Sequence, residues 1–401
     1  MAATESRPAA QIRSSRRACA VAHVCRLNAV RLLILVALVV LPVVGLASAR
    51  EARAGSGSSF VQTNLVSDMP NMAQVQDPNL KNPWGISRGP TTPWWVSDNN
   101  AGVATAYDGK GTPSPAGNPL KVNIPAPGAT TGGTPTGNVF NGDPNDFVVS
   151  DGRTSASSLF IFATEDGAIA GWSPALSRTQ AFIAVDNSDV PDSAAGAVYK
   201  GLAVASTEHG QQLYAANFRA GTVDVFNRAF KAVNLKDAFA DSKIPDGFAP
   251  FGIRAIGDRI FVTYAMQNGA RHDDVAGPGN GFVDVFNTEG KLLERLIQHG
   301  QLNSPWGLAV APEGFGRFGG DLLVGNFGDG RINAYKIESG NFDGALSRPD
   351  GTPIVIDGLW GLGFGNGNNA GPEGILFFAA GINGEKDGLF GTIRPATKPE
   401  N

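Results

Sequence analysis

Short apolar runs, each followed by turn-forming residues, alternate along most of this chain. The clearest unit spans Ser304–Lys336, in which the runs Trp306–Val310 and Asp321–Gly325 precede a turn at Asn326–Gly330. The following segment, Arg331–Lys336, alternates between apolar and polar positions. A period of two bounded by Gly, Asn and Asp is typical of β-hairpins. The unit therefore predicts a strand, a loop, a second strand, a tight turn and a third strand.

The same unit recurs along the sequence. Openings similar to Pro305-Trp306-Gly307 occur at Asn82–Ile86, Tyr199–Ala203, Ala249–Ile253 and Leu359–Leu362. The segment Val223–Asn227 is repeated letter for letter as Val283–Asn287. Six hairpin glycines follow one another at spacings of about 49 to 65 residues: Gly102, Gly167, Gly221, Gly281, Gly330 and Gly388. A repeat of this length is found among β-propellers.

These repeats predict an all-β fold, a six-bladed β-propeller over residues 60–394 that is closed by the N-terminal strand. The strand Phe60–Val66 has no hairpin partner of its own, so we expect it to pair with Leu389–Ile393, because closure removes open sheet edges. In blade two the opening pair is missing. We expect Asp146–Ser150 to be its inner strand and Ile124–Gly137 to be an exposed loop. The 52 glycines and the 17% share of charged residues suit many short strands and tight turns.

The first 49 residues differ from the rest of the chain. Six arginines precede an apolar run, Leu32–Leu46, and Ala47-Ser48-Ala49 fits a cleavage site. We therefore interpret residues 1–49 as a signal peptide, 50–59 as a linker and 395–401 as a tail. A retained membrane anchor is the alternative, but about 15 apolar residues are short for a span. Ser15-Arg16-Arg17 also leaves a twin-arginine signal open.

Cleavage would change both the charge and the chemistry of the mature chain. Both cysteines, Cys19 and Cys25, lie in the leader, so disulfides and thiolate sites are excluded from the secreted part. The leader carries six Arg and one Glu, so its loss takes the formal charge from −4 to about −9. An acidic, secreted protein is not expected to bind nucleic acid or, after cleavage, a membrane. We expect a monomer whose partner is an extracellular small molecule, carbohydrate or protein.

The openings of the repeats predict aromatic side chains around the propeller axis. Trp84, Phe251, Trp306 and Trp360 occupy this position, with Tyr199 near the fifth. Large rings at these positions can fill the space between blades, or they can form a ligand-stacking ring at the channel. The sequence leaves both interpretations open.

Oxygen-bearing residues near the hairpin turns form a second candidate set. Asp98, Asn217 and Asn326 each stand four residues before a turn glycine, and Glu165 lies near the matching place in blade two. Such side chains could converge on a hard cation such as Ca²⁺. Asn and Asp are also common turn residues because they bond to their own backbone.

Other catalytic signals are sparse. An insertion in blade four, Asn268–Asn280, contains His272-Asp273-Asp274, the one cluster that joins a base to carboxylates. It can be a functional loop or an exposed polar tip. The sequence contains no P-loop or HExxH motif.

Several segments resemble the signature of a secreted family of conserved proteins of undetermined function, some of which end in a PEP-CTERM sorting tail. They are Asn64–Asp68, Asp77–Ile86, Trp95–Asn99, Pro135–Asn141, Phe160–Gly167 and Gly171-Trp172. The resemblance extends over about Asn64 to Arg394 and implies no known activity. The sorting tail is not seen, so the resemblance does not imply that route. More loosely, the repeat is similar to NHL-type and gluconolactonase-like propellers, some of which bind a metal at the channel mouth.

The sequence thus predicts a secreted propeller that acts as a binding or scaffold module for an extracellular ligand. The alternative is a metal-dependent hydrolase or lactonase with a Ca²⁺-type site at the channel mouth. A redox or lyase activity is a third hypothesis, for which no residue can be named. Fold alone does not decide among them.

Overall fold

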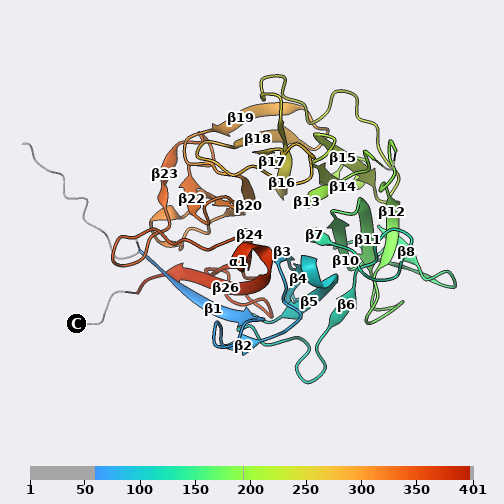
Figure 1. Ribbon diagram of the computed structural model, residues 1–401, viewed down its shortest axis with the longest axis horizontal. Helices are drawn as coiled ribbons and strands as arrows, with labels where there is room; N and C mark the ends of the chain where they lie inside the picture. Colours follow the sequence, from blue (N-terminus) through green and yellow to red (C-terminus); the bar gives the residue numbers. More distant parts are fainter. Residues whose placement is uncertain (1–58, 193, 398–401) are drawn as a thin grey trace, which may run out of the picture. The chain divides into compact units, whose positions relative to one another are not determined.

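A computed structural model describes residues 59–192 and 194–397 of the chain. Nearly all of its regular structure is strand, arranged as six sheets around a central axis (Figure 1). The predicted six-bladed β-propeller is therefore confirmed. The predicted signal peptide and all but Ser59 of the predicted linker lie outside the described residues. No helix in the described part of the chain is long and apolar enough to cross a membrane.

In each blade the strands succeed one another from the axis outward, and neighbouring strands are antiparallel except for the outermost pair of blade six. Blade one contains β3 (Pro83–Ser87), β4 (Trp94–Asp98), β5 (Val103–Tyr107) and β6 (Lys121–Asn123), and blade two contains β7 (Pro135–Phe140), β10 (Phe160–Thr164), β11 (Ala168–Trp172) and β12 (Phe182–Asp186). Blade three contains β13 (Tyr199–Thr207), β14 (Gly210–Asn217) and β15 (Thr222–Asn227), and blade four contains β16 (Phe248–Ile256), β17 (Arg259–Met266), β18 (Phe282–Asn287) and β19 (Leu292–Gln298). Blade five contains β20 (Pro305–Val310), β21 (Leu322–Asn326), β22 (Ile332–Tyr335) and β23 (Phe342–Ala345).

Blade six joins the two ends of the described chain. From the axis outward it contains β24 (Leu359–Phe364), β25 (Leu376–Gly381), β26 (Asp387–Pro395), β1 (Phe60–Ser67) and β2 (Val75–Gln76). β1 runs antiparallel to β26, with Val66 opposite Phe390 and Ser67 opposite Leu389. The N-terminal strand thus pairs as an outer strand with the last blade.

The inner strands approach one another closely because each carries a glycine at the same place: Gly85, Gly137, Gly201, Gly252, Gly307 and Gly361. A Cβ atom on Gly307 would lie 2.5 Å from the carbonyl oxygen of Trp360 in blade six. A Cβ atom on Gly361 would lie 2.6 Å from the carbonyl oxygen of Trp84 in blade one. Each of the other four glycines likewise faces the backbone of the next blade. Only glycine allows backbones to come this near, so these six positions set the narrow centre of the ring.

The apolar core lies between neighbouring blades, where large side chains of facing sheets meet. Between blades one and two, for example, the ring of Trp95 lies 4.5 Å from the rings of both Phe160 and Trp172. All three residues are buried. Because adjacent sheets twist relative to each other, rings of this size fill the wedge that widens away from the axis.

Blade two corrects the sequence prediction. Its inner strand is β7, which begins inside the segment expected to be an exposed loop, and not Asp146–Ser150. The latter region instead forms β8 (Val148–Ser150), which pairs with β9 (Ser155–Ser157) in a separate small sheet. The reason is local: Pro135-Thr136-Gly137 keeps the Pro-x-Gly opening with Thr in place of an aromatic residue, and Thr136 is fully buried.

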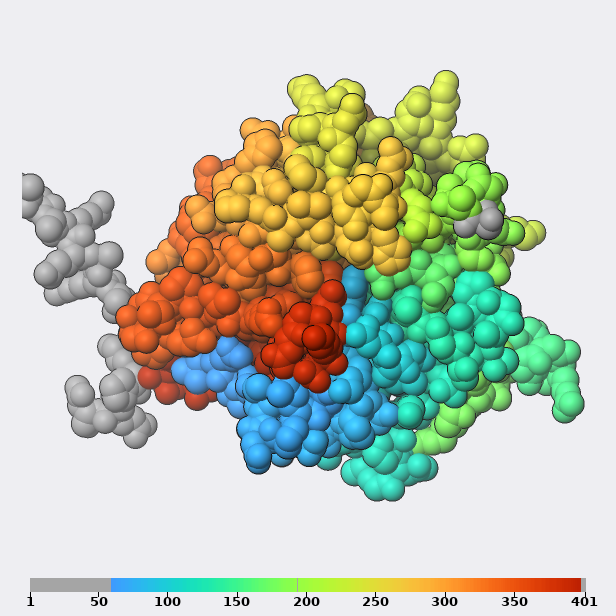
Figure 2. Space-filling model, viewed as in Figure 1, coloured from blue at the N-terminus to red at the C-terminus, as the bar shows by residue number. Residues whose placement is uncertain are grey.

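Three short helical turns lie in the loops between strands. They are η1 (Asn99–Ala101), η2 (Gly316–Phe318) and α1 (Ile382–Glu385). α1 follows β25 and lies near the centre of the ring in Figure 1. In the space-filling view the colours follow one another around the face, and red atoms of the C-terminal part lie near its centre (Figure 2). This face carries the turns between the second and third strands of each blade.

Candidate functional site

Six side chains meet on the axis, one from each inner strand. Each directly precedes one of the six close-approach glycines, and together they are Trp84, Thr136, Lys200, Phe251, Trp306 and Trp360. All six are buried. They form an axial plug that separates two openings. We call the opening at the N-terminal ends of the inner strands the turn mouth, and that at their C-terminal ends the cavity mouth.

The axial plug contains four of the five aromatic residues that the sequence placed at the axis. The rings of Trp84 and Trp360 stack with centroids 3.6 Å apart, and Trp306 and Phe251 each lie 5.7 Å from Trp360. Phe327 stacks on Trp360 from the turn mouth side at 4.0 Å. These rings pack against one another, as in the interpretation that large rings fill the space between blades. Of the four, Trp306 also lines the cavity mouth.

Tyr199 does not join the axial plug. Its ring is buried in the core between blades two and three, and its hydroxyl donates to Asp224 Oδ2 at 2.9 Å. Asn187 Nδ2 donates to the same hydroxyl at 2.7 Å. The neighbouring Lys200 holds the axial position, with Nζ 4.9 Å from the ring of Trp84. A buried ammonium on an aromatic face is a stabilising cation–π contact.

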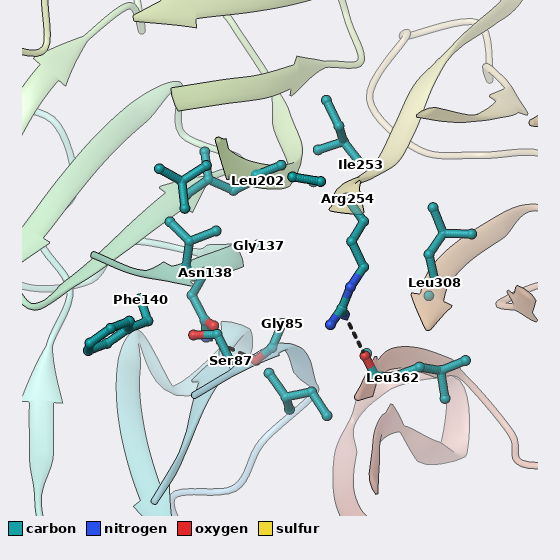
Figure 3. A pocket seen from close by; sticks show the side chains of 18 of the residues that line it. Gly85, Ser87, Gly137, Asn138, Phe140, Leu202, Ile253, Arg254, Leu308 and Leu362 are labelled. Carbon is teal, nitrogen blue, oxygen red and sulfur yellow. Dashed lines mark hydrogen bonds between the residues drawn. The ribbon is translucent and has the colours of Figure 1, made fainter. Parts of the chain in front are cut away.

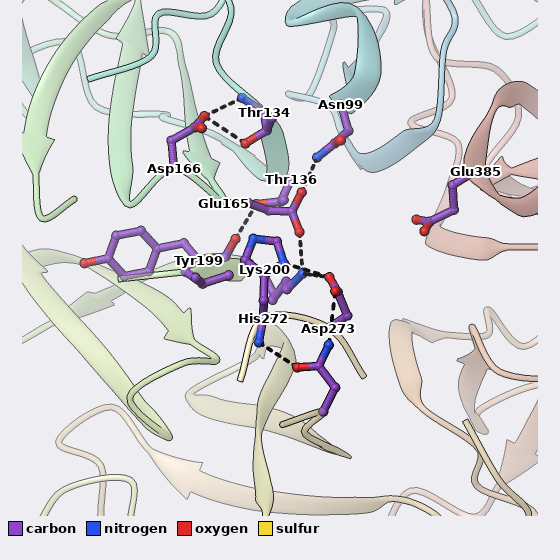
Figure 4. A network of polar contacts seen from close by, with 12 residues as sticks. Asn99, Thr134, Thr136, Glu165, Asp166, Tyr199, Lys200, His272, Asp273 and Glu385 are labelled. Atoms are coloured by element: carbon purple, nitrogen blue, oxygen red, sulfur yellow. Dashed lines mark hydrogen bonds and ion pairs between the residues drawn. The ribbon is translucent and has the colours of Figure 1, made fainter. Parts of the chain in front are cut away.

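Lys200 belongs to a polar network that fills the turn mouth (Figure 4). Its ammonium forms an ion pair with Glu165 and lies 3.9 Å from Asp273 Oδ1. Asn99 Nδ2 donates to Glu165 Oε2 at 2.9 Å, and His272 Nδ1 lies 2.7 Å from Asp273 Oδ1. Glu165 comes from the β10–β11 turn, whereas His272 and Asp273 come from the blade-four insertion. The insertion thus folds over the axis, and His272-Asp273 is part of a site instead of an isolated loop tip.

Two further carboxylates face this network. Burial raises the pKa of Glu385, and the nearby charge of Glu165 adds to this effect. Burial also raises the pKa of Asp274, while Ser304 and Lys200 oppose the rise. Asn82 Nδ2 lies 3.3 Å from Glu385 Oε1, while the buried Asn82 Oδ1 has no hydrogen-bond partner among the described residues. The turn mouth therefore collects more negative than positive charge.

The predicted cation set does not converge. Asp98 accepts a hydrogen bond from Thr105 within blade one, and burial raises its pKa well above the usual value. Asn217 donates to Asp224 within blade three. Asn326 donates to the Gln301 carbonyl and to Asp329 within blade five. Each of these three residues stabilises its own blade, and only Glu165 reaches the axis.

The geometry instead groups Glu165 with His272 and Asp273. One potential ligand atom from each lies within 4.8 Å of the other two. The sequence singled out Glu165 and the His272 cluster separately but gave no sign that they meet. Two residues of the network, Lys200 and Asn99, were missed altogether. The rule that the axial residue directly precedes the inner-strand glycine would have found Lys200 and Thr136.

The cavity mouth has a different character. A cavity of about 270 Å³ opens at the C-terminal ends of the inner strands, lined by residues of all six blades (Figure 3). Its apolar walls are Val139, Leu202, Ile253, Leu308, Leu362 and Phe364, and its polar lining residues include Ser87, Arg88, Asn138 and Arg254. The axial Trp306 also contributes to the lining. A pocket that combines apolar walls with converging polar groups is typical of small-molecule sites.

Arg254 extends from β16 across this cavity toward blade six (Figure 3). Its Nη1 donates to the carbonyl oxygen of Leu362 at 3.0 Å. Burial, and to a lesser extent the charge of Arg88, lowers the pKa of Arg254 to about 10, so it remains charged at neutral pH. No carboxylate of residues 59–192 and 194–397 forms an ion pair with it. Arg88 is held differently, because it donates to the carbonyls of Phe364 and Gly365 at 2.6 and 2.9 Å.

The fold and these two openings define a six-bladed β-propeller with a plugged axis. No protein-family model matches the chain. It is 31% identical to the uncharacterized protein R648 of Acanthamoeba polyphaga mimivirus over 336 residues, which cover 82% of this chain and 78% of R648. It is also 31% identical to the uncharacterized protein L690 of the same virus, covering 82% and 84% of the two chains. The chain therefore belongs to the family that contains R648 and L690.

One solved structure agrees on the fold, and solved structures of low identity show nothing of the activity of this chain. A protein of unknown function from Bacteroides thetaiotaomicron is 11% identical and matches 84% of this chain and 77% of its own, with a TM-score of 0.50. A streptogramin B lyase is 12% identical over 85% of this chain and 99% of its own, with a TM-score of 0.46. At such identities the likeness concerns the architecture alone. The resemblance to the secreted family with sorting tails stays a prediction.

Proposed function

We propose that this protein is a binding propeller that holds a small anionic molecule with an apolar body in the cavity mouth. The observation that supports this is Arg254, a positive charge in an apolar-walled cavity without a carboxylate partner among the described residues. This proposal makes the predicted binding module specific, because it names both a site and a class of ligand.

The charge of Arg254, which is half-buried in the cavity mouth, calls for a partner. A charged group in apolar surroundings is unfavourable unless it is paired and hydrogen-bonded. A guanidinium has five N–H donors in a planar fork, and Arg254 directs only Nη1 to a protein acceptor. A ligand carboxylate can accept from the remaining donors in a bidentate, charge-assisted pair. Such a ligand would satisfy Arg254 while its apolar part contacts Leu202, Ile253 and Leu308.

The size and lining narrow the choice further. A cavity of about 270 Å³ lies at the small end of ligand pockets, which favours a small molecule over a carbohydrate chain or a protein. Ser87 and Asn138 line the cavity opposite Arg254 (Figure 3), and the buried Ser87 Oγ and Asn138 Oδ1 have no hydrogen-bond partner among the described residues. We therefore expect the ligand to carry a second polar group besides its anion.

Ligand-observed NMR with a panel of short aliphatic and aromatic carboxylates, each beside its neutral amide, tests this proposal. We expect carboxylates such as benzoate to bind, and benzamide to bind more weakly. Arg254→Met should weaken carboxylate binding by about 10- to 100-fold, because a hydrogen bond to a charged group contributes about 1.5–3 kcal/mol. Binding of the amides should change little.

The matched control is Arg153→Met, which removes an exposed arginine from the loop between β8 and β9. It should leave every dissociation constant unchanged. Equal binding of benzoate by Arg254→Met and wild type, with both variants folded by circular dichroism, would remove the proposal.

The residues that suggested a metal-dependent hydrolase or lactonase do not come together in the structure. That alternative relied on Asp98, Asn217 and Asn326, which lie apart in three blades. We therefore do not propose that activity.

We also propose that the protein is exported as a monomer. The basic, apolar and Ala47-Ser48-Ala49 segments support cleavage before Arg50. The mass of the protein released into the medium or periplasm should then match a chain beginning at Arg50. A cell-retained product with an intact leader would count against export.

A further inference from the structure

The geometry points to a second site, independent of the first: we infer that the turn mouth binds one divalent transition-metal ion, such as Zn²⁺, through Glu165, His272 and Asp273. This trio combines two carboxylates and an imidazole from two different blades. It lies across the axial plug from the cavity, so the two sites do not share a residue.

The three ligand atoms lie close enough to converge on one ion after a local adjustment. They lie within 4.8 Å of one another, whereas tetrahedral metal bonds of about 2.1 Å hold ligand atoms roughly 3.4 Å apart. The side chains would therefore have to approach one another by up to about 1.4 Å on binding the ion. Three protein ligands would leave a coordination position for water or another small ligand, as in open zinc sites.

Neighbouring groups already orient the three side chains. Asn99 and Lys200 hold Glu165, and Asn268 Nδ2 donates to Asp273 Oδ2 at 3.2 Å. The backbone N–H of His272 donates to Asn268 Oδ1 at 3.1 Å. Outer partners of this kind fix the orientation of metal ligands and are an integral part of metal sites.

The surroundings favour an added cation. The ammonium of Lys200 is the one cation that contacts this trio in the described chain, and it faces the carboxylates of Glu165 and Asp273. Glu385 stands across the mouth from them (Figure 4). Asn82, which is 3% exposed, adds a polar side chain to this mouth: its Nδ2 contacts Glu385, while its Oδ1 lies against Gly381 and has no hydrogen-bond partner among the described residues.

The donor set decides which metal is expected. Ca²⁺ takes six to eight oxygen ligands, and this group offers an imidazole nitrogen. Imidazole suits Zn²⁺ and similar transition metals. Both the residues and the ion thus differ from the Ca²⁺ site that the sequence led us to expect.

Calorimetric titration of EDTA-treated, buffer-exchanged protein with Zn²⁺ and with Ca²⁺ tests this inference. We expect one Zn²⁺ per chain, a rise in melting temperature and little response to Ca²⁺. His272→Ala should weaken Zn²⁺ binding at least tenfold, and it should fold because His272 lies partly exposed in an insertion. Co²⁺ should give a visible absorption spectrum that His272→Ala changes.

His209→Ala is the matched control, because His209 is exposed in the β13–β14 turn beside Glu208. It should bind Zn²⁺ like wild type. Absence of stoichiometric Zn²⁺ binding, or equal affinity in His272→Ala and wild type, would overturn the inference. His272→Ala should retain benzoate binding and Arg254→Met should retain Zn²⁺ binding, so the two proposals can fail separately.

Discussion

Each inner strand reaches the axis with one glycine and the side chain that precedes it. The glycine lets the next blade approach, and the preceding side chain fills the centre. In five blades the latter is aromatic or a threonine, but in blade three it is Lys200. One substitution at a repeated position therefore converts an apolar plug into the base of a charged network. Lys200 thus distinguishes blade three from the otherwise similar repeats and provides the positive charge of the turn mouth network.

The glycine positions give the first prediction at this scale. Gly307→Ala should destabilise the fold by about 1–3 kcal/mol, because the new methyl group would lie 2.5 Å from the Trp360 carbonyl oxygen. A urea denaturation curve measures the loss. Gly374→Ala is the control, since a Cβ atom there meets no atom within 4 Å. Equal midpoints for the two variants would show that the inner strands do not approach as described.

At the scale of elements, β1 links two blades. It pairs with β26 in blade six, and Phe60 at its start packs on Phe315 and Phe318 of blade five, with ring centroids 4.9 and 5.7 Å apart. The backbone N–H of Phe60 also donates to the Ser347 carbonyl at 2.8 Å. The N-terminal strand thus stabilises the junction between the last two blades.

This junction yields a second prediction. Phe60→Ala should lower the free energy of unfolding by about 3–5 kcal/mol, because it removes a fully buried ring. Phe342→Ala removes a ring that is 49% exposed at the rim of blade five and should cost far less. Thermal and urea unfolding of both variants provide the comparison. A Phe60→Ala protein as stable as Phe342→Ala would mean that β1 adds little to the ring.

The insertion in blade four is the element that completes the turn mouth. It is long enough to reach over blade three, where the β14–β15 turn is short, and it brings His272 and Asp273 to Glu165. The sequence identified the insertion and its polar cluster. The sequence could not predict that His272 and Asp273 lie beside Glu165. The path of the insertion depends on contacts such as those of Asn268, and no local sequence pattern indicates these contacts.

At the scale of the molecule, the fold was predictable because one hairpin pattern repeats six times with glycine at the turns. Blade two was misassigned because Thr136 replaces the aromatic residue that marks the other openings. The sites were less predictable, because they consist of exceptions to the repeat. Arg254 follows the Phe251-Gly252-Ile253 opening, and no local sequence pattern indicates that it is a site residue. It lies in a cavity only because the inner strands of all six blades come together around it.

The whole ring thus separates two openings of opposite charge, the cavity mouth and the turn mouth. On one side of the axial plug lies a cavity with apolar walls and the guanidinium of Arg254, and on the other side lies a network rich in carboxylates. An organic anion and a metal cation would then bind at opposite mouths without competing. The arrangement depends on all six blades, because every inner strand contributes to the cavity lining.

The central claim is that Arg254 receives the anionic group of a small ligand. A crystal structure of the protein grown with benzoate tests it most directly. We predict electron density for benzoate in the cavity mouth, with its carboxylate within hydrogen-bond distance of the Arg254 guanidinium and its ring against Leu202, Ile253 or Leu308. Benzoate bound elsewhere, or a cavity filled by protein side chains while Arg254 pairs with a carboxylate of the chain, would contradict it.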